Sequence, residues 1–410
     1  MMKKTTRIAI YAFLQIMIFS GMTGAAFASP DAAVEQPGAV IEQHVDMNEQ
    51  PAEQDPPVID YDELISEITE NSAFNGNVLI AQSGNILFEN SYGYSDFKKR
   101  KPLTKDSVFQ LASVSKQFTA MAVMMLHDEG KLSFDDPVAK YIKGFPYKTV
   151  TIRHLLTHRA GLPDYLRFSR KYRSRKAGYL TNKELIKIIC KYKPKLLFQP
   201  GSYFEYSNTG YAVLSSVIEE VSGKPYRTFM QERIFTPLGM KKTYVYDPNK
   251  NRNPGNPTRG YTARRRPVYI GYLDGVTGDK GIYSTVEDLY LWDQALYTET
   301  LIAQKTLEEA FEPYGVDSRN NTEYGFGWRI KTLEDGEKVV FHAGFWGGYK
   351  TLFVRRLSDQ TAVIVLSNRA NWNYCNIETM MQKMGTSHLS RNEKPASDAE
   401  NVNSVIIKSN

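Results

Sequence analysis

Cysteine is scarce in this sequence, which has only Cys190 and Cys375 among its 410 residues. Two cysteines so far apart cannot form a metal site by themselves. A disulfide between them is chemically possible outside the cytoplasm. However, Cys190 lies on the apolar side of a predicted helix, together with Leu185, Ile186 and Ile189. We therefore expect both cysteines to be buried free thiols.

Several motifs of common enzyme classes are also missing. The sequence has no G-x-S-x-G turn, no phosphate-binding P-loop and no G-x-G-x-x-G dinucleotide fingerprint. His154 and His158 have the i, i+4 spacing of zinc-binding helices, but "HLLTH" lacks the glutamate of such sites and no third ligand is evident. We expect these two histidines to have hydrogen-bonded structural roles, with no metal bound.

A long hydrophobic run occurs only near the start of the chain. Two lysines and an arginine precede it, and "AFA" before Ser29 fits a signal-peptidase site. This pattern predicts a signal peptide over residues 1–28, cleaved after Ala28, with an uncleaved membrane anchor as the alternative. We expect an exported protein, periplasmic or extracellular, with no stable membrane insertion after cleavage.

Basic residues are absent from residues 29–57, which contain seven acidic ones. Such a segment cannot bury enough apolar surface to fold, so it is predicted to be a disordered acidic spacer. Residues 58–385 are rich in aromatic residues and long enough for one large domain or two lobes around a cleft. Residues 386–410 are predicted to form a loose polar tail.

The whole chain has a net charge of +6, with basic clusters at residues 167–176 and 264–266. Such clusters occur in proteins that bind nucleic acid, membrane surfaces or acidic polymers. Export makes nucleic acid the least fitting of these partners. A solvated loop face is the alternative interpretation of both clusters.

The order of the elements predicts an α+β fold. A β-hairpin pattern, "NVLIAQSGNILFENSYGY", opens the domain, and strand patterns return in "YGFGWRIK", "KVVFHAG", "GYKTLFVRR" and "TAVIVLSN", followed by a short helix. Helical periodicity occurs between them, near residues 113–129, 182–192, 208–222, 226–234, 285–297 and 303–313. We predict one antiparallel sheet built from both chain ends and flanked by helices, with an inserted, mostly helical lobe. We expect the functional site to lie between the sheet and the helical lobe.

The segment "FQLASVSKQFTA" places Ser113, Ser115 and Lys116 at the start of an apolar run. A serine there can cap a helix, but a capping box has Glu or Gln three residues later, where this chain has lysine. The helix dipole and burial both disfavour a charged lysine at this position, which would make Lys116 a base. Ser113 shares the helix face of Lys116, whereas Ser115 points nearly opposite. Ser113 is therefore the candidate nucleophile, and a capping role is compatible with it.

Two further motifs follow in order, Y-S-N at residues 206–208 before a predicted helix and H-A-G at residues 342–344 on a predicted strand. Together with S-x-x-K, they resemble the serine β-lactamase and penicillin-recognising enzyme family. The similarity is to the branch of class C β-lactamases, D-alanyl-D-alanine carboxypeptidases and related esterases. The segments "TIRHLLTHRAGLPDY", "GDKGIYSTVEDLYLWDQAL" and "YGFGWRI" are similar to connecting stretches of that family.

The resemblance implies a role for each motif residue. Ser113 would attack the substrate carbonyl and form an acyl-enzyme, while Lys116 and Tyr206 share the proton transfers. Asn208 would bind the substrate amide and hold Lys116. The backbone N–H groups of Ser113 and Phe345 would form the oxyanion hole.

Other expectations also come from the resemblance. Gly344 and Trp346 would contact the substrate, and no metal or cofactor is needed. The basic stretch Arg167–Lys176 follows "GLPDY" and is expected to line one side of the site.

The third motif departs from the K-T-G of other family members. A lysine there offers a permanent charge to a substrate carboxylate, whereas His342 offers one only when it is protonated. This difference weakens the case for an efficient β-lactamase. The segment Trp346-Gly347-Gly348 offers another register, similar to the W-x-G of some family esterases. We prefer H-x-G because the aromatic and glycine residues that follow it have the family's spacing.

The leading hypothesis is an exported D-alanyl-D-alanine carboxypeptidase, or a related D-amino-acid amidase or peptidase. Its substrates would be small acyl, peptide or cell-wall compounds, including anionic ones. The alternatives are a family esterase, a weak class C-like β-lactamase and, from another class, a non-catalytic wall-binding protein. The intact set of Ser113, Lys116, Tyr206 and Asn208 argues against the last, because a binding module has no need for all four.

Overall fold

The computed structural model describes residues 61–68, 74–172, 178–249, 257–269, 271–319, 321–371 and 377–384. All of these residues belong to one compact unit, Pro56–Asn410. The predicted signal peptide, acidic spacer and polar tail lie outside the described residues, as does Cys375, and the domain limits at 58 and 385 remain predictions. None of the helices in the described part of the chain combines the length and the apolar character that crossing a bilayer requires.

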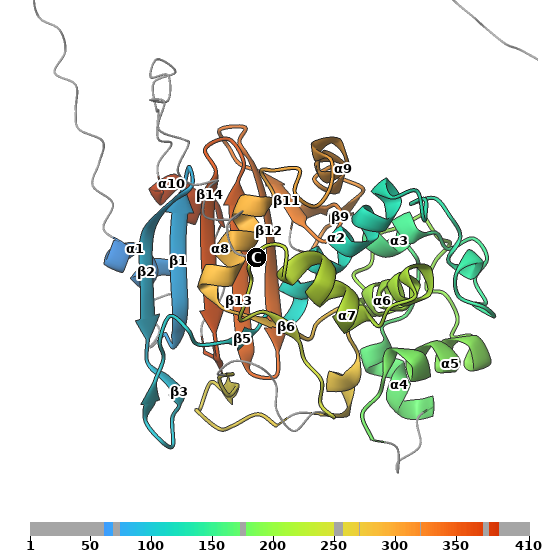
Figure 1. Ribbon diagram of the computed structural model, residues 1–410, viewed down its shortest axis with the longest axis horizontal. Helices are drawn as coiled ribbons and strands as arrows, with labels where there is room; N and C mark the ends of the chain where they lie inside the picture. Colours follow the sequence, from blue (N-terminus) through green and yellow to red (C-terminus); the bar gives the residue numbers. More distant parts are fainter. Residues whose placement is uncertain are drawn as a thin grey trace, which may run out of the picture. The chain divides into compact units, whose positions relative to one another are not determined.

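An antiparallel eight-stranded sheet, in the order β2-β1-β14-β13-β12-β11-β10-β9, forms one side of this unit (Figure 1). Its strands are β1 (Gly76–Gln82), β2 (Asn85–Tyr92), β9 (Gly315–Asp317), β10 (Thr322–Tyr324), β11 (Arg329–Thr332), β12 (Lys338–Trp346), β13 (Tyr349–Arg356) and β14 (Thr361–Ser367). Strand β1 pairs with β14 in the register Gly76↔Ser367 to Ala81↔Ala362. The two ends of the domain therefore meet inside one sheet, as the sequence predicts.

Short strands connect the sheet to the rest of the unit. Strand β5 (Phe109–Gln110) and β6 (Tyr244–Val245) both pair with β8 (Ile282–Ser284) in a small three-stranded sheet. Two more pairs are β3 (Tyr94–Asp96) with β4 (Lys101–Pro102), and β7 (Tyr261–Thr262) with β15 (Arg369–Ala370). These short strands were not predicted, because two or three residues are too few to show an alternating pattern.

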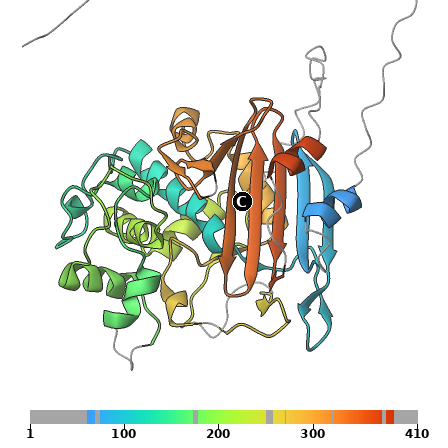
Figure 2. The same cartoon turned by 180° about the vertical axis from the view of Figure 1, so that it is seen from behind.

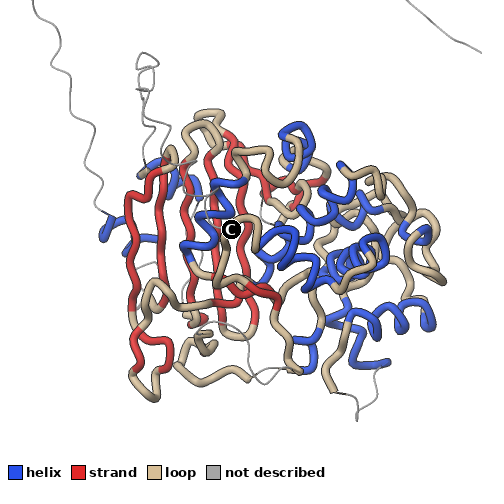
Figure 3. Tube along the Cα trace, in the orientation of Figure 1, coloured by secondary structure: helices blue, strands red, loops and turns tan. Residues whose placement is uncertain are grey.

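Most of the helices lie in the chain between β5 and β9, and Figure 3 shows many of them gathered to one side of the sheet (Figure 3). They are α2 (Ser115–Asp128), α3 (Ile152–Leu156), α4 (Tyr165–Tyr172), α5 (Asn182–Tyr192), α6 (Asn208–Ser222), α7 (Tyr226–Met230), α8 (Val286–Ala295) and α9 (Gln304–Ala310), with single turns η2 (Val138–Lys140), η3 (Gln231–Phe235) and η4 (Tyr272–Gly275). The predicted ranges 182–192 and 208–222 match α5 and α6. Cys190 on α5 is a free cysteine, but it is only partly buried.

Both faces of the large sheet are covered. Helices α1 (Tyr61–Ile68) and α10 (Ile377–Lys383) pack on one face, as Figure 2 shows, and contribute Leu64, Ile65, Met380 and Met381 to an apolar cluster there (Figure 2). Helix α8 and the helical lobe cover the other face. Strand β14 has all seven residues buried for this reason, which explains its continuous apolar sequence "TAVIVLS".

The segment around Ser113 differs from the prediction in one respect. A single helix was expected over residues 113–129, but a 3₁₀ turn, η1 (Ala112–Val114), precedes α2. Ala112 has a positive φ of 49°, which is unfavourable for a residue with a side chain. Helix α2 itself is buried from Ser115 to Leu126, as its apolar sequence predicts.

Candidate active site

The amine of Lys116 lies among three polar groups from three different segments. Its Nζ is 3.2 Å from Ser113 Oγ, 2.9 Å from Asn208 Oδ1 and 2.8 Å from the backbone oxygen of Asp279. Lys116 is completely buried, whereas Ser113 and Asn208 are partly exposed. The amine therefore approaches the accessible serine hydroxyl from the protein interior.

Both protonation states of the Lys116 amine fit these partners. The Asn208 Oδ1 and the Asp279 carbonyl can only accept hydrogen bonds, whereas the Ser113 hydroxyl can donate or accept. A neutral amine can donate to the two fixed acceptors and use its lone pair for the serine proton, and an ammonium can donate to all three. A proton can therefore pass between Ser113 and Lys116 without rearrangement of the site.

Ser113 and Ser115 face apart. The Oγ of Ser115 is fully buried and accepts a hydrogen bond from the backbone N–H of Ile282, at 3.2 Å. Ser113 is the serine whose hydroxyl lies beside the Lys116 amine. The opposite directions of the two side chains agree with the helical spacing of the sequence.

Asn208 begins α6, and Asp164 orients its side chain. Asp164 Oδ2 accepts hydrogen bonds from Asn208 Nδ2 at 2.8 Å and from the Asn208 backbone N–H at 3.2 Å. These bonds direct Asn208 Oδ1 toward Lys116 and leave the second Nδ2 hydrogen for a substrate carbonyl. Asp164 belongs to "GLPDY", a segment for which no chemical role was predicted.

Tyr206 lies against two cations. The Lys116 Nζ is 5.0 Å and the Arg329 Cζ 5.7 Å from the centroid of its ring. Arg329 belongs to β11 in the segment "YGFGWRI", and its side chain is 14% exposed and bonded to Asp317 Oδ2 at 2.9 Å. Arg329 was not predicted, because nothing near it in the sequence indicates that β11 lies beside Tyr206.

The two histidines with zinc-like spacing have separate structural roles. His154 Nδ1 accepts a hydrogen bond from the Thr151 backbone N–H at 3.3 Å in the cap of α3. His158 Nδ1 accepts one from the Ser207 backbone N–H at 3.3 Å, and the His158 and Tyr206 ring centroids are 4.1 Å apart. His158 therefore positions Tyr206. In the described residues, no group of three or more His, Cys, Asp or Glu side chains could hold a metal ion.

His342 is buried on β12, with only 1% of its surface exposed. Its Nδ1 is 2.8 Å from the backbone oxygen of Ala343, and its Nε2 is 3.0 Å from Tyr324 Oη. A carbonyl can only accept, so Nδ1 carries the proton and Nε2 accepts from the tyrosine. Both ring nitrogens are therefore already bonded within the protein.

The surroundings of His342 also keep it neutral. Burial, followed by the charges of Arg329 and Lys116, lowers the pKa of His342 well below its ordinary value. The idea that a His342 imidazolium could bind a substrate carboxylate therefore finds no support. The geometry instead gives His342 a supporting role, since it holds Tyr324, whose ring lies 6.1 Å from that of Tyr206.

Gly344 lets β12 approach the turn that carries Ser113. A Cβ at this position would lie 2.5 Å from the Leu111 backbone oxygen and 2.9 Å from the Ala112 Cβ, so any side chain would push the strand away. The glycine of the H-x-G motif thus has a packing role in addition to the substrate contact predicted for it. Phe345, whose N–H was assigned to the oxyanion hole, follows directly and has a 60% exposed side chain.

Comparison with known proteins identifies the family. A family model described as Beta-lactamase matches residues 61–378, more than half of the chain. The chain belongs to the β-lactamase family. Over 322 residues, 75% of this chain and 70% of the relative, it is 36% identical to penicillin-binding protein 4* of Bacillus subtilis (strain 168).

Two further relatives extend the comparison of this β-lactamase-family chain. It is 25% identical to a D-aminopeptidase of Gluconobacter oxydans (strain 621H) over 296 residues, 72% of this chain and 55% of that protein. A solved octameric penicillin-binding protein homologue from Pyrococcus abyssi has a TM-score of 0.70 and 28% identity, covering 80% of this chain and 77% of that one. These matches confirm the predicted family and fold, and the protein is a serine hydrolase of this fold.

A second buried lysine lies beside the motif residues of the β-lactamase-family site. Lys280, 3% exposed, contacts Tyr165 Oη and lies 3.4 Å from Asp279 Oδ2. Its Nζ is also 4.9 Å from the ring centroid of Trp346, whose Nε1 donates to Asp274 Oδ1 at 2.7 Å. Trp346, predicted to contact the substrate, is therefore fixed by a cation on its face and a carboxylate at its edge.

The basic stretch 167–176 is described only in part. Arg167, Arg170 and Lys171 are exposed on α4, which starts directly after Asp164. Residues 173–177 lie outside the described residues. That this stretch lines the site remains a prediction.

Replacing Asp164 should lower catalytic efficiency without unfolding the protein. In Asp164→Ala, Asn208 loses both bonds that orient it, so we expect kcat/KM to fall roughly tenfold to a hundredfold, the effect of losing a hydrogen bond to a charged group. Asp164→Asn keeps an acceptor oxygen and should retain more activity than the alanine variant. Equal losses in the two variants, measured at unchanged thermal stability, would contradict a role of Asp164 in orienting Asn208.

The buried histidines should make the fold sensitive to mild acid. Burial is the largest cause that lowers the pKa values of His342 and His158, so below about pH 6.5 the unfolded chain binds protons that the folded one does not. The free energy of unfolding should therefore fall with decreasing pH, by up to about 1.4 kcal/mol per pH unit for each histidine. The free energy of unfolding, measured by urea denaturation at several pH values between about 6.5 and about 5, should change less with pH in His342→Gln than in the wild type. An unchanged pH dependence would mean that His342 is protonated in the folded state.

Proposed function

We propose that this protein is an exported serine hydrolase that forms an acyl-enzyme on Ser113 and acts on D-alanyl peptides or D-amino-acid amides. The observation that carries the proposal is the convergence of Ser113 Oγ, Asn208 Oδ1 and the Asp279 carbonyl on the buried Lys116 amine. A binding protein has no need to keep an amine in contact with an accessible serine hydroxyl.

Acylation begins when Ser113 Oγ attacks the substrate carbonyl carbon. The Ser113 proton passes to Lys116, and the carbonyl oxygen becomes an oxyanion held by the backbone N–H groups of Ser113 and Phe345. Asn208 positions the substrate by donating its free Nδ2 hydrogen. Preorganised donors of this kind lower the barrier because they need no rearrangement as the charge develops.

The intermediate then collapses to the acyl-enzyme. The bond from carbon to the leaving nitrogen breaks, and that nitrogen takes a proton delivered through Tyr206, which lies beside Lys116. Water subsequently attacks the ester carbonyl of the acyl-enzyme, and Tyr206 and Lys116 together accept the proton that the water loses. That proton then passes to Ser113 Oγ as the ester bond breaks and the carboxylic acid product leaves.

The substrate class follows from the relatives and from the charges near the site. The relatives are named penicillin-binding protein and D-aminopeptidase, names that connect the fold with β-lactam recognition and with D-amino acids. A carboxypeptidase must also bind a free C-terminal carboxylate. With His342 neutral, Arg329 is the partly exposed cation beside Tyr206 that suits this task.

An esterase remains the second candidate, because the same acyl-enzyme chemistry cleaves esters without a charged anchor. Activity of a class C-like β-lactamase type is expected to be weak, because β12 carries no permanent charge at His342. A hydrolysis panel of a D-Ala-D-Ala peptide, nitrocefin and p-nitrophenyl acetate separates these hypotheses. Turnover of the acetate ester alone would favour the esterase.

Ser113 should be the serine that becomes acylated. Fluorescent penicillin or a fluorophosphonate should label wild-type protein at Ser113, located by mass spectrometry of the peptides, and Ser113→Ala should lose both labelling and turnover. Ser115 supplies the matched control, because its Oγ is occupied by the Ile282 N–H. An adduct on Ser115 or Ser207, or full activity in Ser113→Ala, would refute the assignment.

Arg329 should distinguish substrates with a free carboxylate from those without. Arg329→Gln should lower kcat/KM for a D-Ala-D-Ala peptide roughly tenfold to a hundredfold, with a much smaller effect on D-alanine amide, which lacks the carboxylate. Arg319→Gln is the matched control, because Arg319 also pairs with Asp317, at 3.5 Å, but its side chain is 61% exposed. If Arg329→Gln lowers kcat/KM equally for both substrates, Arg329 acts only on Tyr206 and does not bind the substrate carboxylate.

A further inference from the structure

Two charged side chains are buried beside the proposed acyl-enzyme site, and the mechanism described above uses neither of them. They belong to Asp279 and Lys280, which follow each other in the segment "GDKGIYST". The side chain of Asp279 is 1% exposed and that of Lys280 is 4% exposed. Burying two charges is unfavourable unless they are well paired, so a pair at this place calls for a physical reason.

A neutral tyrosine links the two charges. Tyr165 Oη donates a hydrogen bond to Asp279 Oδ2 at 2.9 Å, while the Lys280 ammonium donates to the same hydroxyl oxygen and lies 3.4 Å from Asp279 Oδ2. Burial is the largest cause that raises the pKa of Tyr165 well above its ordinary value, and the charge of Asp279 adds to it. Because the tyrosine stays neutral, Lys280 is the cation that compensates Asp279 in this cluster.

The carboxylate of Asp279 also lies near the amine of Lys116. The backbone oxygen of Asp279 accepts a hydrogen bond from Lys116 Nζ at 2.8 Å. Five covalent bonds separate that oxygen from the carboxylate oxygens of the same residue, so the carboxylate lies at most about 10 Å from the amine. Without compensation, its charge would favour the ammonium form of Lys116, which cannot accept the Ser113 proton.

The direction of the Asp279 carbonyl depends on the same contacts. The chain bends through residues 278–280, and Thr119 Oγ1 on α2 donates to the Gly278 backbone oxygen at 2.7 Å. This bond holds the beginning of the bend. Asp279 itself is held through its carboxylate, by Tyr165 and Lys280. The acceptor of the Lys116 amine is therefore positioned in part by the charge pair.

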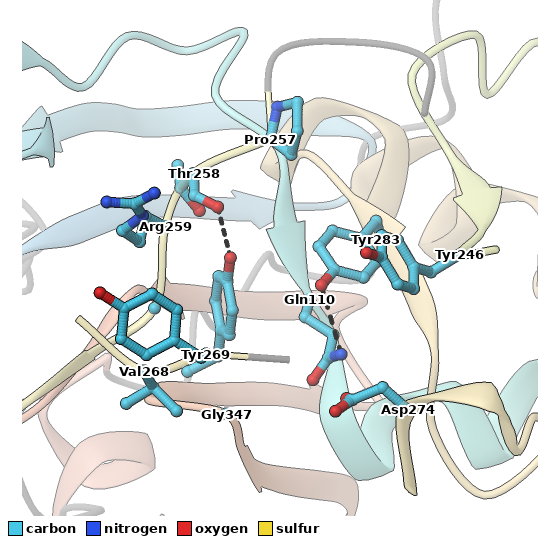
Figure 4. A pocket seen from close by; sticks show the side chains of 12 residues that line it. Gln110, Tyr246, Pro257, Thr258, Arg259, Val268, Tyr269, Asp274, Tyr283 and Gly347 are labelled. Atoms are coloured by element: carbon cyan, nitrogen blue, oxygen red, sulfur yellow. Dashed lines mark hydrogen bonds between the residues drawn. The ribbon is translucent and has the colours of Figure 1, made fainter. Parts of the chain in front are cut away.

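The ammonium of Lys280 lies over the ring of Trp346 as well, a residue predicted to contact the substrate. Its Nζ is 4.9 Å from the ring centroid, a distance typical of a cation–π contact. Asp274 accepts a hydrogen bond from Trp346 Nε1 at 2.7 Å, and Figure 4 shows Asp274 among the side chains that surround a neighbouring pocket (Figure 4). An indole held only at its edge can turn about that bond, whereas a cation over its face fixes the plane of the ring.

We propose that Lys280 is a positioning residue for hydrolysis at Ser113. Its charge compensates Asp279, which keeps the Asp279 carbonyl in place beside a Lys116 amine that can accept a proton. The same charge fixes the Trp346 ring next to the substrate. The inference rests on the proposed function, which it extends from the motif residues to a segment between them.

The rate at which Ser113 reacts with a fluorophosphonate tests the compensation of Asp279. Lys280→Met removes the charge and keeps a side chain of similar length. We expect its labelling rate to fall about tenfold, the effect of a unit charge about 10 Å away at an effective dielectric constant of about 20. The double variant Asp279→Asn/Lys280→Met buries neither charge and should recover most of the rate. Wild-type labelling in Lys280→Met, or equal losses in the single and double variants, would overturn the compensation.

A control variant separates positioning from stability. Lys280→Met leaves a buried carboxylate unpaired and should lower the thermal stability, so labelling rates are expressed per folded molecule. Arg355→Met breaks another buried pair, that of Arg355 on β13 with Asp293 on α8, whose Nε and Oδ1 atoms are 2.6 Å apart. It should also lower stability but keep the labelling rate. A loss as large as that of Lys280→Met would show an effect of stability alone and would overturn the inference.

The double variant also tests the contact with Trp346, because it lacks the ammonium without leaving a charge unpaired. The fluorescence of Trp346 is obtained as the difference between each protein and its Trp346→Phe counterpart. Acrylamide should quench it at least about twofold more strongly in the double variant than in the wild type, because the cation no longer covers the ring. KM for a D-Ala-D-Ala peptide should rise severalfold with little change in kcat. Unchanged quenching and KM would overturn the role of Lys280 at Trp346.

The labelling experiment distinguishes failure of this inference from failure of the proposed function. Labelling of Ser113 that does not depend on Lys280 would overturn the inference alone. Labelling that depends on Lys280, in a protein that hydrolyses no D-alanyl peptide, would support the inference while refuting the proposed substrate class. A wild-type protein that is not labelled at Ser113 would refute the acyl-enzyme and, with it, the positioning role of Lys280.

Discussion

The burial of one amine constrains the whole site. Lys116 has no exposed surface, and a buried amine is unfavourable unless its hydrogen-bonding groups find partners. Its three partners come from the η1 turn, from the start of α6 and from the loop before β8. A shift in any of these segments leaves the amine unsatisfied, so one atom fixes the relative positions of the nucleophile, the amide side chain and the carbonyl.

A closed chain of hydrogen bonds supports that arrangement. Asn208 is held by Asp164, and Tyr165, the next residue, donates to Asp279 Oδ2 at 2.9 Å. Asp279 in turn provides the backbone oxygen for Lys116. The segment "GLPDY" thus controls two of the three acceptors of the amine. Because Asp164 and Tyr165 are adjacent in this segment, Asn208 and Asp279 cannot move independently of each other.

The parts of this site that depend on local spacing could be predicted, and those that depend on distant pairing could not. The spacing of Ser113 and Lys116 indicated that the two side chains share a face, and the sheet built from both chain ends followed from the strand patterns. No local pattern pointed to Asp164, because its bond to Asn208 crosses 44 residues. Nor could local patterns reveal that Tyr324 binds His342 Nε2 and leaves no free nitrogen there.

Because His342 is neutral, the positive charge beside the candidate site of this β-lactamase-family member comes from other residues than the third motif. A lysine in the third motif would bring a cation to β12, but here the cations nearest the Tyr206 ring are those of Lys116 on α2 and Arg329 on β11, within the described residues. In the mechanism proposed for Ser113, Arg329 stays charged at every step, whereas Lys116 exchanges its proton with the serine. The site therefore keeps one permanent cation beside its proton-transfer groups while the other varies. In that mechanism, Tyr206 would pass protons next to a constant positive charge, and β12 would supply backbone N–H groups rather than side-chain charge.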